Sequence, residues 1–379
     1  MADEVRSLDL QGLQGLIDTL GAHGYAVMGP TVRDGAIVHA PVRTVDDLPR
    51  GWGDEQEAAT YRLRRRDDDA IFGFASGAQA VKPVLFPAQE LIWRGRRTGE
   101  EFTVNDPAAD APGGPYALLG VRSCDLAALA IHDVVLVSRG FTDVRYAARR
   151  AGAFVVAVTC TAPGGTCFCA SMGTGPRPGT GYDLALTELL DGGPHRFLVE
   201  VGTPRGAEIL AEVPSALAPP ADRQAADDVA AWSTAHMGRT LDTEGIKELF
   251  YTNTENPRWD DVAARCLACT NCTLVCPTCF CTSVVDVADL TGDAAERRRV
   301  WDSCFSEDYS YIHGGSIRPE VRSRYRQWIT HKLASWQDQF GSSGCVGCGR
   351  CITWCPAAID ITAEAAALRW TPQPAAGSN

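Results

Sequence analysis

Long apolar runs are absent from this sequence, and so is a recognisable leader. A membrane-spanning helix needs about 20 predominantly apolar residues, and the longest charge-free segment, residues 151–176, is interrupted by Gly, Pro and Thr after Val158. The first ten residues, Met1 to Leu10, are acidic overall and lack the apolar core of a secretory signal. We therefore expect a soluble protein that resides in the cytoplasm.

Positive charge is scarce. The chain has 35 Lys and Arg against 47 Asp and Glu, a formal net charge of −12, whereas binding nucleic acid phosphates requires a basic face. Two arginine runs, Arg64–Arg66 and Arg297–Arg299, stand beside acidic residues, which predicts a solvated, salt-bridged surface. The charge balance argues against nucleic acid as a partner.

The motifs of common enzyme sites are also missing. The sequence has no G-x-G-x-x-G at a strand–helix junction, no P-loop and no evident Ser/His/Asp constellation. The Gly-rich segment 173–181 lacks the strand before it and the helix after it that a dinucleotide site needs. We expect no catalytic residues in this chain.

Cysteine, by contrast, is abundant. In a reducing cytosol, 15 cysteines indicate metal sites rather than disulfides. Eight of them form a repeat, because residues 266–277 (CLACTNCTLVCP) and 345–356 (CVGCGRCITWCP) both read C-x2-C-x2-C-x3-C-P. In two-cluster ferredoxins the fourth cysteine of each such motif binds the other cluster. The predicted ligands are Cys266, Cys269, Cys272 and Cys355 for the first [4Fe-4S] cluster, and Cys345, Cys348, Cys351 and Cys276 for the second.

The alternative for these eight cysteines is a pair of structural zinc sites. Zinc modules usually combine two C-x2-C pairs, often with histidine, rather than four cysteines that end in Cys-Pro. Two copies of the ferredoxin pattern in one chain favour iron.

Seven cysteines lie outside the repeat. Cys124 follows an expected strand at the start of an expected helix, Cys160 ends the next strong strand, and Cys167 and Cys169 stand in a Gly-rich loop. If the two strands are neighbours, these thiols meet at one sheet edge and hold a third [4Fe-4S] cluster; the alternative is buried thiols without metal. The other three are uncertain additional ligands for iron, or side chains that pack against the clusters: Cys279, Cys281 and Cys304.

A basic segment stands out in this acidic chain and has two interpretations. Its cations either offset the negative charge of clusters and thiolates or form a solvated helix face, and the solvated face is the default expectation. The residues are Arg318, Arg322, Arg324, Arg326 and Lys332.

The predicted fold class is α+β multidomain, with an N-terminal α/β domain followed by a mostly α-helical two-[4Fe-4S] ferredoxin domain. Expected helices are 6–20, 126–134, 141–150, 222–236 and 244–251, and expected strands are 25–28, 36–42, 70–74, 82–86, 116–121, 153–160 and 196–201. The predicted division is 1–215 for the α/β domain with probable cluster cysteines, 216–240 for a linker and helix, 241–366 for the dicluster ferredoxin domain and 367–379 for a disordered tail.

The residues that surround the cysteines resemble a known family. The ordered segments GVRSCDLAAL, CTAPGGTCFCASMGTGP, CLACTNCTLVCPTCFC, WDSCF, RSRYRQWITHKL and GCVGCGRCITWCPAAIDI are similar to β subunits of cytoplasmic, NAD(P)-linked [NiFe] hydrogenases (sulfhydrogenases). The same family includes the A subunit of anaerobic sulfite reductase. Two departures are Ser123, where the family usually has proline, and Ala357–Ala358 in place of Val-Gly; neither removes a ligand.

The resemblance implies a heterotetramer. Its expected partners are a flavoprotein subunit that exchanges hydride with NAD(P)H, an iron–sulfur small subunit and a [NiFe] large subunit, with FAD and NAD(P) bound by the flavoprotein and not by this chain. It implies that this chain is a non-catalytic electron-transfer subunit of a hydrogenase complex. The alternatives are the equivalent subunit of an anaerobic sulfite or sulfur reductase and, from another class, an iron–sulfur redox sensor, for which no output domain is evident.

Overall fold

The computed structural model describes residues 5–105, 115–190 and 193–370. An eight-stranded sheet dominates its N-terminal part, in the order β12-β1-β11-β10-β9-β8-β2-β3. The four central strands β10, β9, β8 and β2 run parallel, and the outer strands pair antiparallel. The bounds are β1 (Arg6–Leu8), β2 (Ala26–Arg33), β3 (Ala36–Pro41), β8 (Tyr116–Arg122), β9 (Phe154–Val158), β10 (Leu184–Leu189), β11 (Arg196–Val201) and β12 (Ala216–Leu217).

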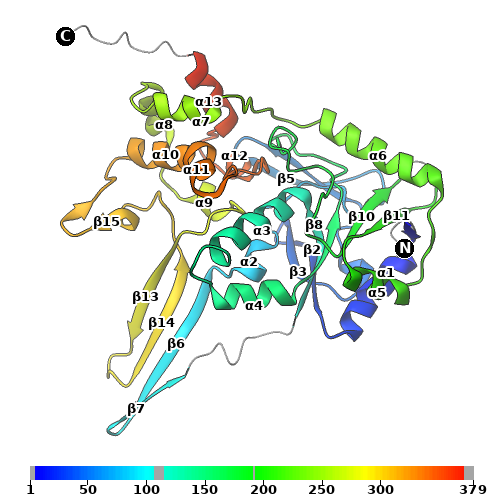
Figure 1. Cartoon of the computed structure of the whole chain (residues 1–379), viewed down its shortest axis with the longest axis horizontal. Helices are drawn as coiled ribbons and strands as arrows, with labels where there is room; N and C mark the ends of the chain where they lie inside the picture. Colours follow the sequence, from blue (N-terminus) through cyan, green and yellow to red (C-terminus); the bar gives the residue numbers. More distant parts are fainter. Residues whose placement is uncertain (1–4, 106–114, 191–192, 371–379) are drawn as a thin grey trace.

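Helices cover both faces of this sheet (Figure 1). On one face, α1 (Leu10–Ala22) and α5 (Pro204–Glu212) pack over Leu119 and Val156. On the other, α3 (Ser123–Leu136) and α4 (Val144–Gly152) pack over the alternate residues Leu118 and Val155. Because successive strand residues point to opposite faces, β8 and β9 are apolar throughout and belong to both cores.

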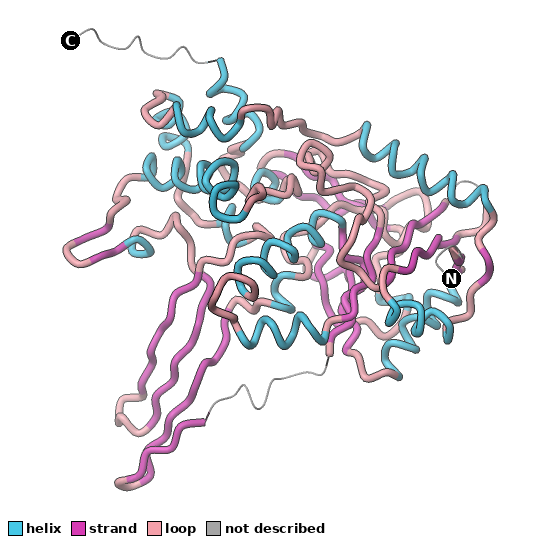
Figure 2. The backbone as a smooth tube through the Cα atoms, in the orientation of Figure 1, coloured by secondary structure: helices cyan, strands magenta, loops and turns pink. Residues whose placement is uncertain are grey.

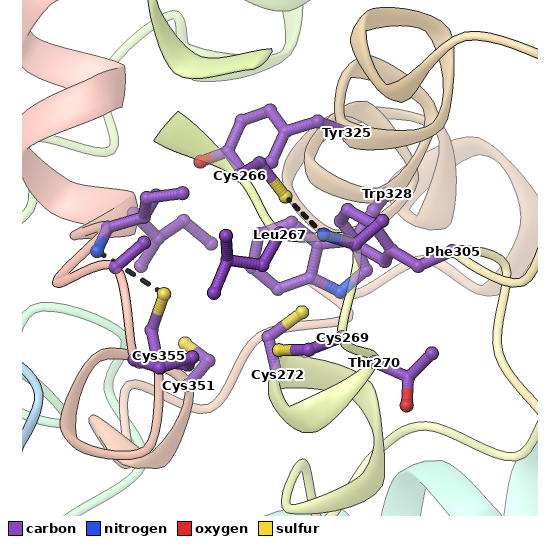
Figure 3. A pocket seen from close by; sticks show the side chains of 15 residues that line it. Cys266, Leu267, Cys269, Thr270, Cys272, Phe305, Tyr325, Trp328, Cys351 and Cys355 are labelled. Carbon is purple, nitrogen blue, oxygen red and sulfur yellow. Dashed lines mark hydrogen bonds between the residues drawn. The ribbon is translucent and has the colours of Figure 1, made fainter. Parts of the chain in front are cut away.

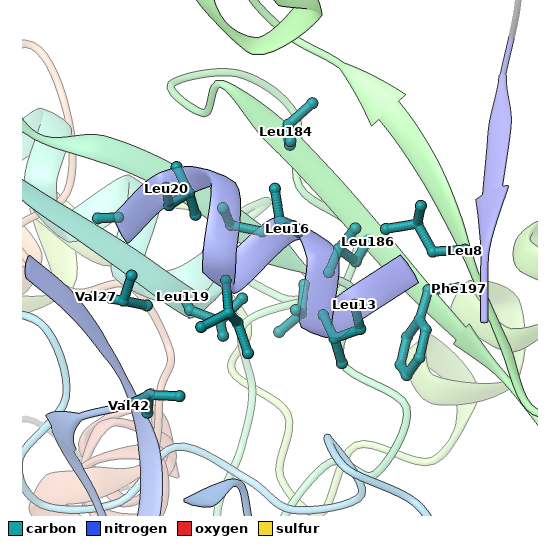
Figure 4. Packing of buried hydrophobic residues seen from close by; sticks show 14 of the residues in the cluster. Leu8, Leu13, Leu16, Leu20, Val27, Val42, Leu119, Leu184, Leu186 and Phe197 are labelled. Atoms are coloured by element: carbon teal, nitrogen blue, oxygen red, sulfur yellow. The ribbon is translucent and has the colours of Figure 1, made fainter. Parts of the chain in front are cut away.

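The first helix shows how the sequence directs this packing. Asp9 caps α1 by accepting a hydrogen bond from the Gly12 N–H at 2.8 Å. Leu13, Leu16 and Leu20 recur at helical spacing and point toward the strands (Figure 4). Burial of this stripe against the sheet fixes the helix in place.

A second core holds the cysteine-rich C-terminal part. Its large members, Trp259, Tyr325 and Trp328, come from helices far apart in sequence. The elements are α7 (Ile246–Thr252), α8 (Arg258–Arg265), α9 (Asn271–Leu274), η3 (Asp308–Ser310), β15 (Tyr311–Ile312), β16 (Gly315–Ser316), α10 (Val321–Thr330), the π-helical segment η4 (His331–Ser335), α11 (Trp336–Phe340), α12 (Arg350–Thr353) and α13 (Ile361–Trp370).

A four-stranded sheet projects from the body of the molecule (Figure 2). Its order is β13-β14-β6-β7, so strands from the two halves of the chain pair with each other through β14 and β6. The bounds are β6 (Gln89–Thr98), β7 (Glu101–Asn105), β13 (Thr282–Ala288) and β14 (Ala294–Trp301). The remaining elements are the hairpin β4 (Trp52–Glu57) and β5 (Thr60–Arg65), with η1 (Val45–Asp47), α2 (Lys82–Leu85) and α6 (Pro220–Ala235).

Four local predictions are wrong. Residues 6–8, the start of the expected helix 6–20, form strand β1 because they pair with β11 and β12. Within the expected strand 82–86, residues 82–85 form helix α2, because Pro83 occupies a first-turn position where it favours a helix. Residues 70–74 form no strand, because the N–H groups of Ile71 and Phe72 donate to the Glu188 carboxylate instead of to a neighbouring strand. Residues 367–370, predicted to be disordered, continue α13, in which Leu368 is buried; residues 371–379 lie outside the described residues.

The segment 216–240, predicted to be a linker and helix, lies against the large sheet. Strand β12 adds to the sheet edge, and Ala226 of α6 packs on Leu189 and Leu198. Within the described residues no helix has the combination of length and apolar character that crossing a membrane requires.

Candidate metal centres

The two cysteine motifs have the same backbone conformation. Ala268 and Gly347 stand at equivalent positions and both have positive φ, as do Thr270 and Gly349. This conformation points the Ala268 N–H at Cys266 Sγ and the Gly347 N–H at Cys345 Sγ, each at 3.4 Å. The short helices α9 and α12 follow at the same offset. The repeat therefore forms two loops whose amides donate to sulfur, as iron–sulfur ligand loops do.

The first cavity lies where the two motifs meet (Figure 3). Aromatic side chains of Phe305, Tyr325 and Trp328 line its other walls. The Ile359 N–H donates a hydrogen bond to Cys355 Sγ at 3.4 Å. The cavity is lined by the whole predicted set of first-cluster ligands, Cys266, Cys269, Cys272 and Cys355.

The second cavity is deeper in the molecule, between the second motif and the α10–η4–α11 helix. Phe168 from the N-terminal part and Lys332 from η4 contribute to its wall. It is lined by the predicted second-cluster ligands Cys276, Cys345, Cys348 and Cys351. Each cavity thus takes three cysteines from one motif and the fourth from the other.

A third cavity lies at the edge of the large sheet. Strands β8 and β9 are parallel neighbours, so the segments that leave their carboxyl ends reach the same edge. Ser76 Oγ is 3.9 Å from Cys124 Sγ, and Cys169 Sγ is 3.9 Å from Met237 Sδ. The cavity is lined by all four cysteines assigned to a third site, Cys124, Cys160, Cys167 and Cys169, together with Cys348.

The three cavities form a row with shared walls. Cys351 lines the first and second cavities, and Cys348 lines the second and third. The loops also bind each other directly, because the Phe168 N–H donates to the Gly347 carbonyl at 2.8 Å. The order along the row is therefore third, second, first.

Burial disfavours the thiolate form of most of these cysteines when no cation is present. It raises the pKa of Cys345 to about 12 and that of Cys169 to about 12, and it raises the pKa of Cys351 well above the ordinary value. Metal ligands must be thiolates. Without a cation in the cavity, most of these sulfurs would be protonated at neutral pH. Four cysteines around an enclosed space thus fit a metal cluster and leave protonated thiols when it is removed.

The remaining cysteines form pairs beside the row. Cys279 hydrogen-bonds to Cys276, and Cys281 hydrogen-bonds to Cys304 and to Tyr309. In the described part of the chain, Cys279, Cys281 and Cys304 do not line any of the three cavities. The structure therefore places them next to the row and not within it.

Two residues of functional interest, Asp125 and Arg350, were not predicted from the sequence. Asp125 and Arg350 form a buried salt bridge of 2.6 Å that connects helix α3 to helix α12. For the basic segment, the default expectation of a solvated face is wrong for Arg324 and Lys332, which are buried. It holds for Arg322 and Arg326, which pair with exposed Glu255. A signal existed: Ile329 and Trp336 stand three residues before and four after Lys332, so the lysine lies on an apolar helix face.

The donors around the three cavities are cysteine thiols, the ligands of iron–sulfur clusters. Among the residues that the structure describes, no group of three Cys, His, Asp or Glu side chains converges closely enough to hold one metal ion. The thiols instead surround cavities, with backbone N–H groups directed at sulfur. This arrangement defines a multi-cluster iron–sulfur protein of the ferredoxin type.

Comparison with known proteins agrees with this class and narrows it. The 4Fe-4S dicluster domain family matches residues 265–359. Sulfhydrogenase 2 subunit beta of Pyrococcus furiosus is 32% identical over 328 residues, which cover 83% of this chain and 90% of the relative. The chain belongs to the sulfhydrogenase β-subunit family. No solved structure matches it.

The close contact at Gly347 leads to a first prediction. A Cβ there would lie 2.6 Å from the Phe168 carbonyl oxygen and 2.7 Å from Cys169 Cα, and φ is +65°. Gly341 has φ +74° but nothing within 4 Å of its Cβ position, so it is a matched control. We expect Gly341→Ala to cost about 1–2 kcal/mol from backbone strain alone, and Gly347→Ala to cost more and to lower iron content. Equal denaturation midpoints and equal iron contents for the two variants would contradict this.

Proposed function

We propose that this chain is the iron–sulfur electron-transfer subunit of a cytoplasmic [NiFe] hydrogenase complex. It relays electrons between a flavoprotein subunit that binds NAD(P)H and the hydrogenase module, which consists of an iron–sulfur small subunit and a [NiFe] large subunit. When bound, [4Fe-4S] clusters accept and release single electrons, and a flavin converts these into hydride chemistry. The observation that carries the proposal is the row of three cysteine-lined cavities.

The chain's own residues provide what a relay needs. They hold the cavities against one another through Cys348 and Cys351, and they exclude water from the second cavity with Phe168, Val346 and Ile361. The first cavity, at one end of the row, has walls that are mostly apolar but include the exposed residues Leu267 and Cys269. Membership of the sulfhydrogenase β-subunit family supports the hydrogenase assignment, since the relative is itself named as a subunit.

Iron content tests the number of clusters. Anaerobically purified protein is expected to contain about twelve iron and twelve sulfide per chain, four of each for every [4Fe-4S] cluster. A content of about eight iron per chain would mean that the third cavity holds no cluster. Colourless protein with zinc in place of iron would refute the proposal.

The third cluster has its own prediction. Cys124→Ala removes a thiol that lines only the third cavity, so iron is expected to fall from about twelve to about eight per chain. Ser76→Ala, which removes the neighbouring hydroxyl without removing a thiol, is the control and should keep about twelve. Wild-type iron content in Cys124→Ala would show that Cys124 is not a ligand.

Activity of the assembled complex separates hydrogenase from sulfite or sulfur reductase. Hydrogen-dependent reduction of NAD(P)+ by the complex that co-purifies with this chain is the expected result. Activity with sulfite and none with hydrogen would exclude the hydrogenase assignment while leaving the relay intact.

A further inference from the structure

Lys332 occupies a special position beside the second cavity. It lies in η4, a π-helical segment inserted between α10 and α11, and π-bulges often mark functional positions in helices. Its side chain is buried, with 4% exposed. The ammonium group donates to Cys276 Sγ at 3.2 Å and to Thr278 Oγ1 at 3.0 Å. The lysine therefore touches a sulfur that the proposed function assigns to the second cluster.

The backbone of Lys332 holds the other motif. Its carbonyl oxygen accepts hydrogen bonds from the Gly344 N–H at 2.8 Å and from Ser343 Oγ at 3.2 Å, immediately before Cys345. Thr278 Oγ1 donates to the Gly344 carbonyl at 2.7 Å. One residue thus connects the fourth cysteine of the first motif to the start of the second, and the position of its ammonium group relative to the second cavity is fixed.

At the first cavity the nearby buried cation, Arg324, acts on Cys266 through space and donates to the carbonyls of Arg318 and Pro319 instead of to a sulfur. No lysine or arginine is among the described residues that line it, and the sulfurs of Cys266 and Cys355 accept hydrogen bonds from backbone N–H groups. Lys82 provides an internal comparison at the second site. Its ammonium group donates to the Cys276 carbonyl oxygen at 3.2 Å and lies 3.8 Å from the centre of the Trp301 ring, so it approaches the same residue without contacting its sulfur.

A positive donor at a ligand sulfur favours the more negative, reduced state of a cluster. The reduced cluster carries one more negative charge, and the attraction is strong because the site is buried. Hydrogen bonds to the sulfurs and net charge are also among the factors that set cluster potentials. The burial of Lys332 itself requires an anionic partner, which the thiolate of Cys276 supplies.

We propose that Lys332 raises the reduction potential of the cluster at the second cavity above that of the cluster at the first, so that the second cluster is reduced before the first. This inference rests on the proposed function, because it requires clusters in both cavities. It assigns Lys332 a positioning and tuning role, not a catalytic one.

The test is a redox titration of the anaerobically purified full chain, followed by low-temperature electron paramagnetic resonance. In Lys332→Met the ratio of reduced to oxidised cluster at the second site is expected to fall at least about tenfold at a fixed potential, which is about 59 mV for a one-electron couple. Lys332→Arg, which keeps the charge, should restore most of this shift. Lys82→Met is the matched control and should give a smaller shift.

The outcomes are distinguishable. Unchanged midpoint potentials in Lys332→Met with full iron content would overturn the inference and leave the proposed function standing. A shift in Lys82→Met as large as that in Lys332→Met would also overturn it. If Lys332→Met loses iron, the Lys332→Arg variant distinguishes the two explanations. Wild-type iron content and potential in Lys332→Arg would support the inference. Loss of iron in Lys332→Arg as well would show a purely structural role for Lys332. Wild-type protein without iron would refute the proposed function instead.

Discussion

Replacing Cys276 or Cys355 by alanine is expected to remove one cluster. In each case the lost cluster is the one whose other three ligands belong to the other cysteine motif. Cys355 lines the first cavity with the first three cysteines of the first motif, whereas Cys276 lines the second cavity. Each single variant should therefore fall from about twelve to about eight iron per chain, and the double variant to about four.

Pairs of substitutions separate this crossed arrangement from an uncrossed one. Crossed ligation predicts that Cys266→Ala/Cys355→Ala keeps about eight iron, since both residues serve one cluster, and that Cys266→Ala/Cys276→Ala keeps about four. Ligation within each motif predicts the reverse. Cys304→Ala, a cysteine outside the three cavities, is the control and should retain about twelve. Iron and sulfide determination of these six variants decides the arrangement.

Removing the Arg350 side chain is expected to destabilise the protein severely. Arg350 and Asp125 are each 1% exposed, and their salt bridge connects the residue after Cys124 to the residue before Cys351. Breaking a buried pair from one side leaves the other charge unpaired, which typically costs about 3–5 kcal/mol. We expect Arg350→Met to lower the free energy of unfolding by this amount in anaerobic chemical denaturation.

Two comparisons isolate the cause. Arg64→Met breaks a salt bridge to Glu55 in which both side chains are more than half exposed, so its cost should stay within about 1 kcal/mol. The double variant Asp125→Leu/Arg350→Met removes both charges and should recover most of the loss. A free energy of unfolding for Arg350→Met close to that of Arg64→Met would show that the pair does not join the two halves of the molecule.

Much of the large sheet was predictable because its strands and helices are locally encoded. The expected strand at 196–201 matches β11, and 116–121 lies within β8. Their apolar residues form short runs, a length that favours a buried strand over a helix. The projecting sheet was not predictable from local patterns, because β6 and β14 pair across about two hundred residues and their exposed faces carry many arginines instead of an apolar pattern.

The eight ferredoxin cysteines follow from sequence alone, because three thiols at x2 spacing on one tight loop must converge wherever that loop lies. Only the tertiary structure brings Cys124, Cys160, Cys167 and Cys169 to one cavity, since their meeting depends on β8 and β9 being neighbours. The contact of Lys332 with Cys276 is likewise a tertiary property. An ammonium group and a sulfur 56 residues apart become partners when the helix that carries the lysine buries its apolar face against the motif. Local spacing therefore determined which cysteines form the two ferredoxin motifs, and packing decided which cavities adjoin and which charges face them.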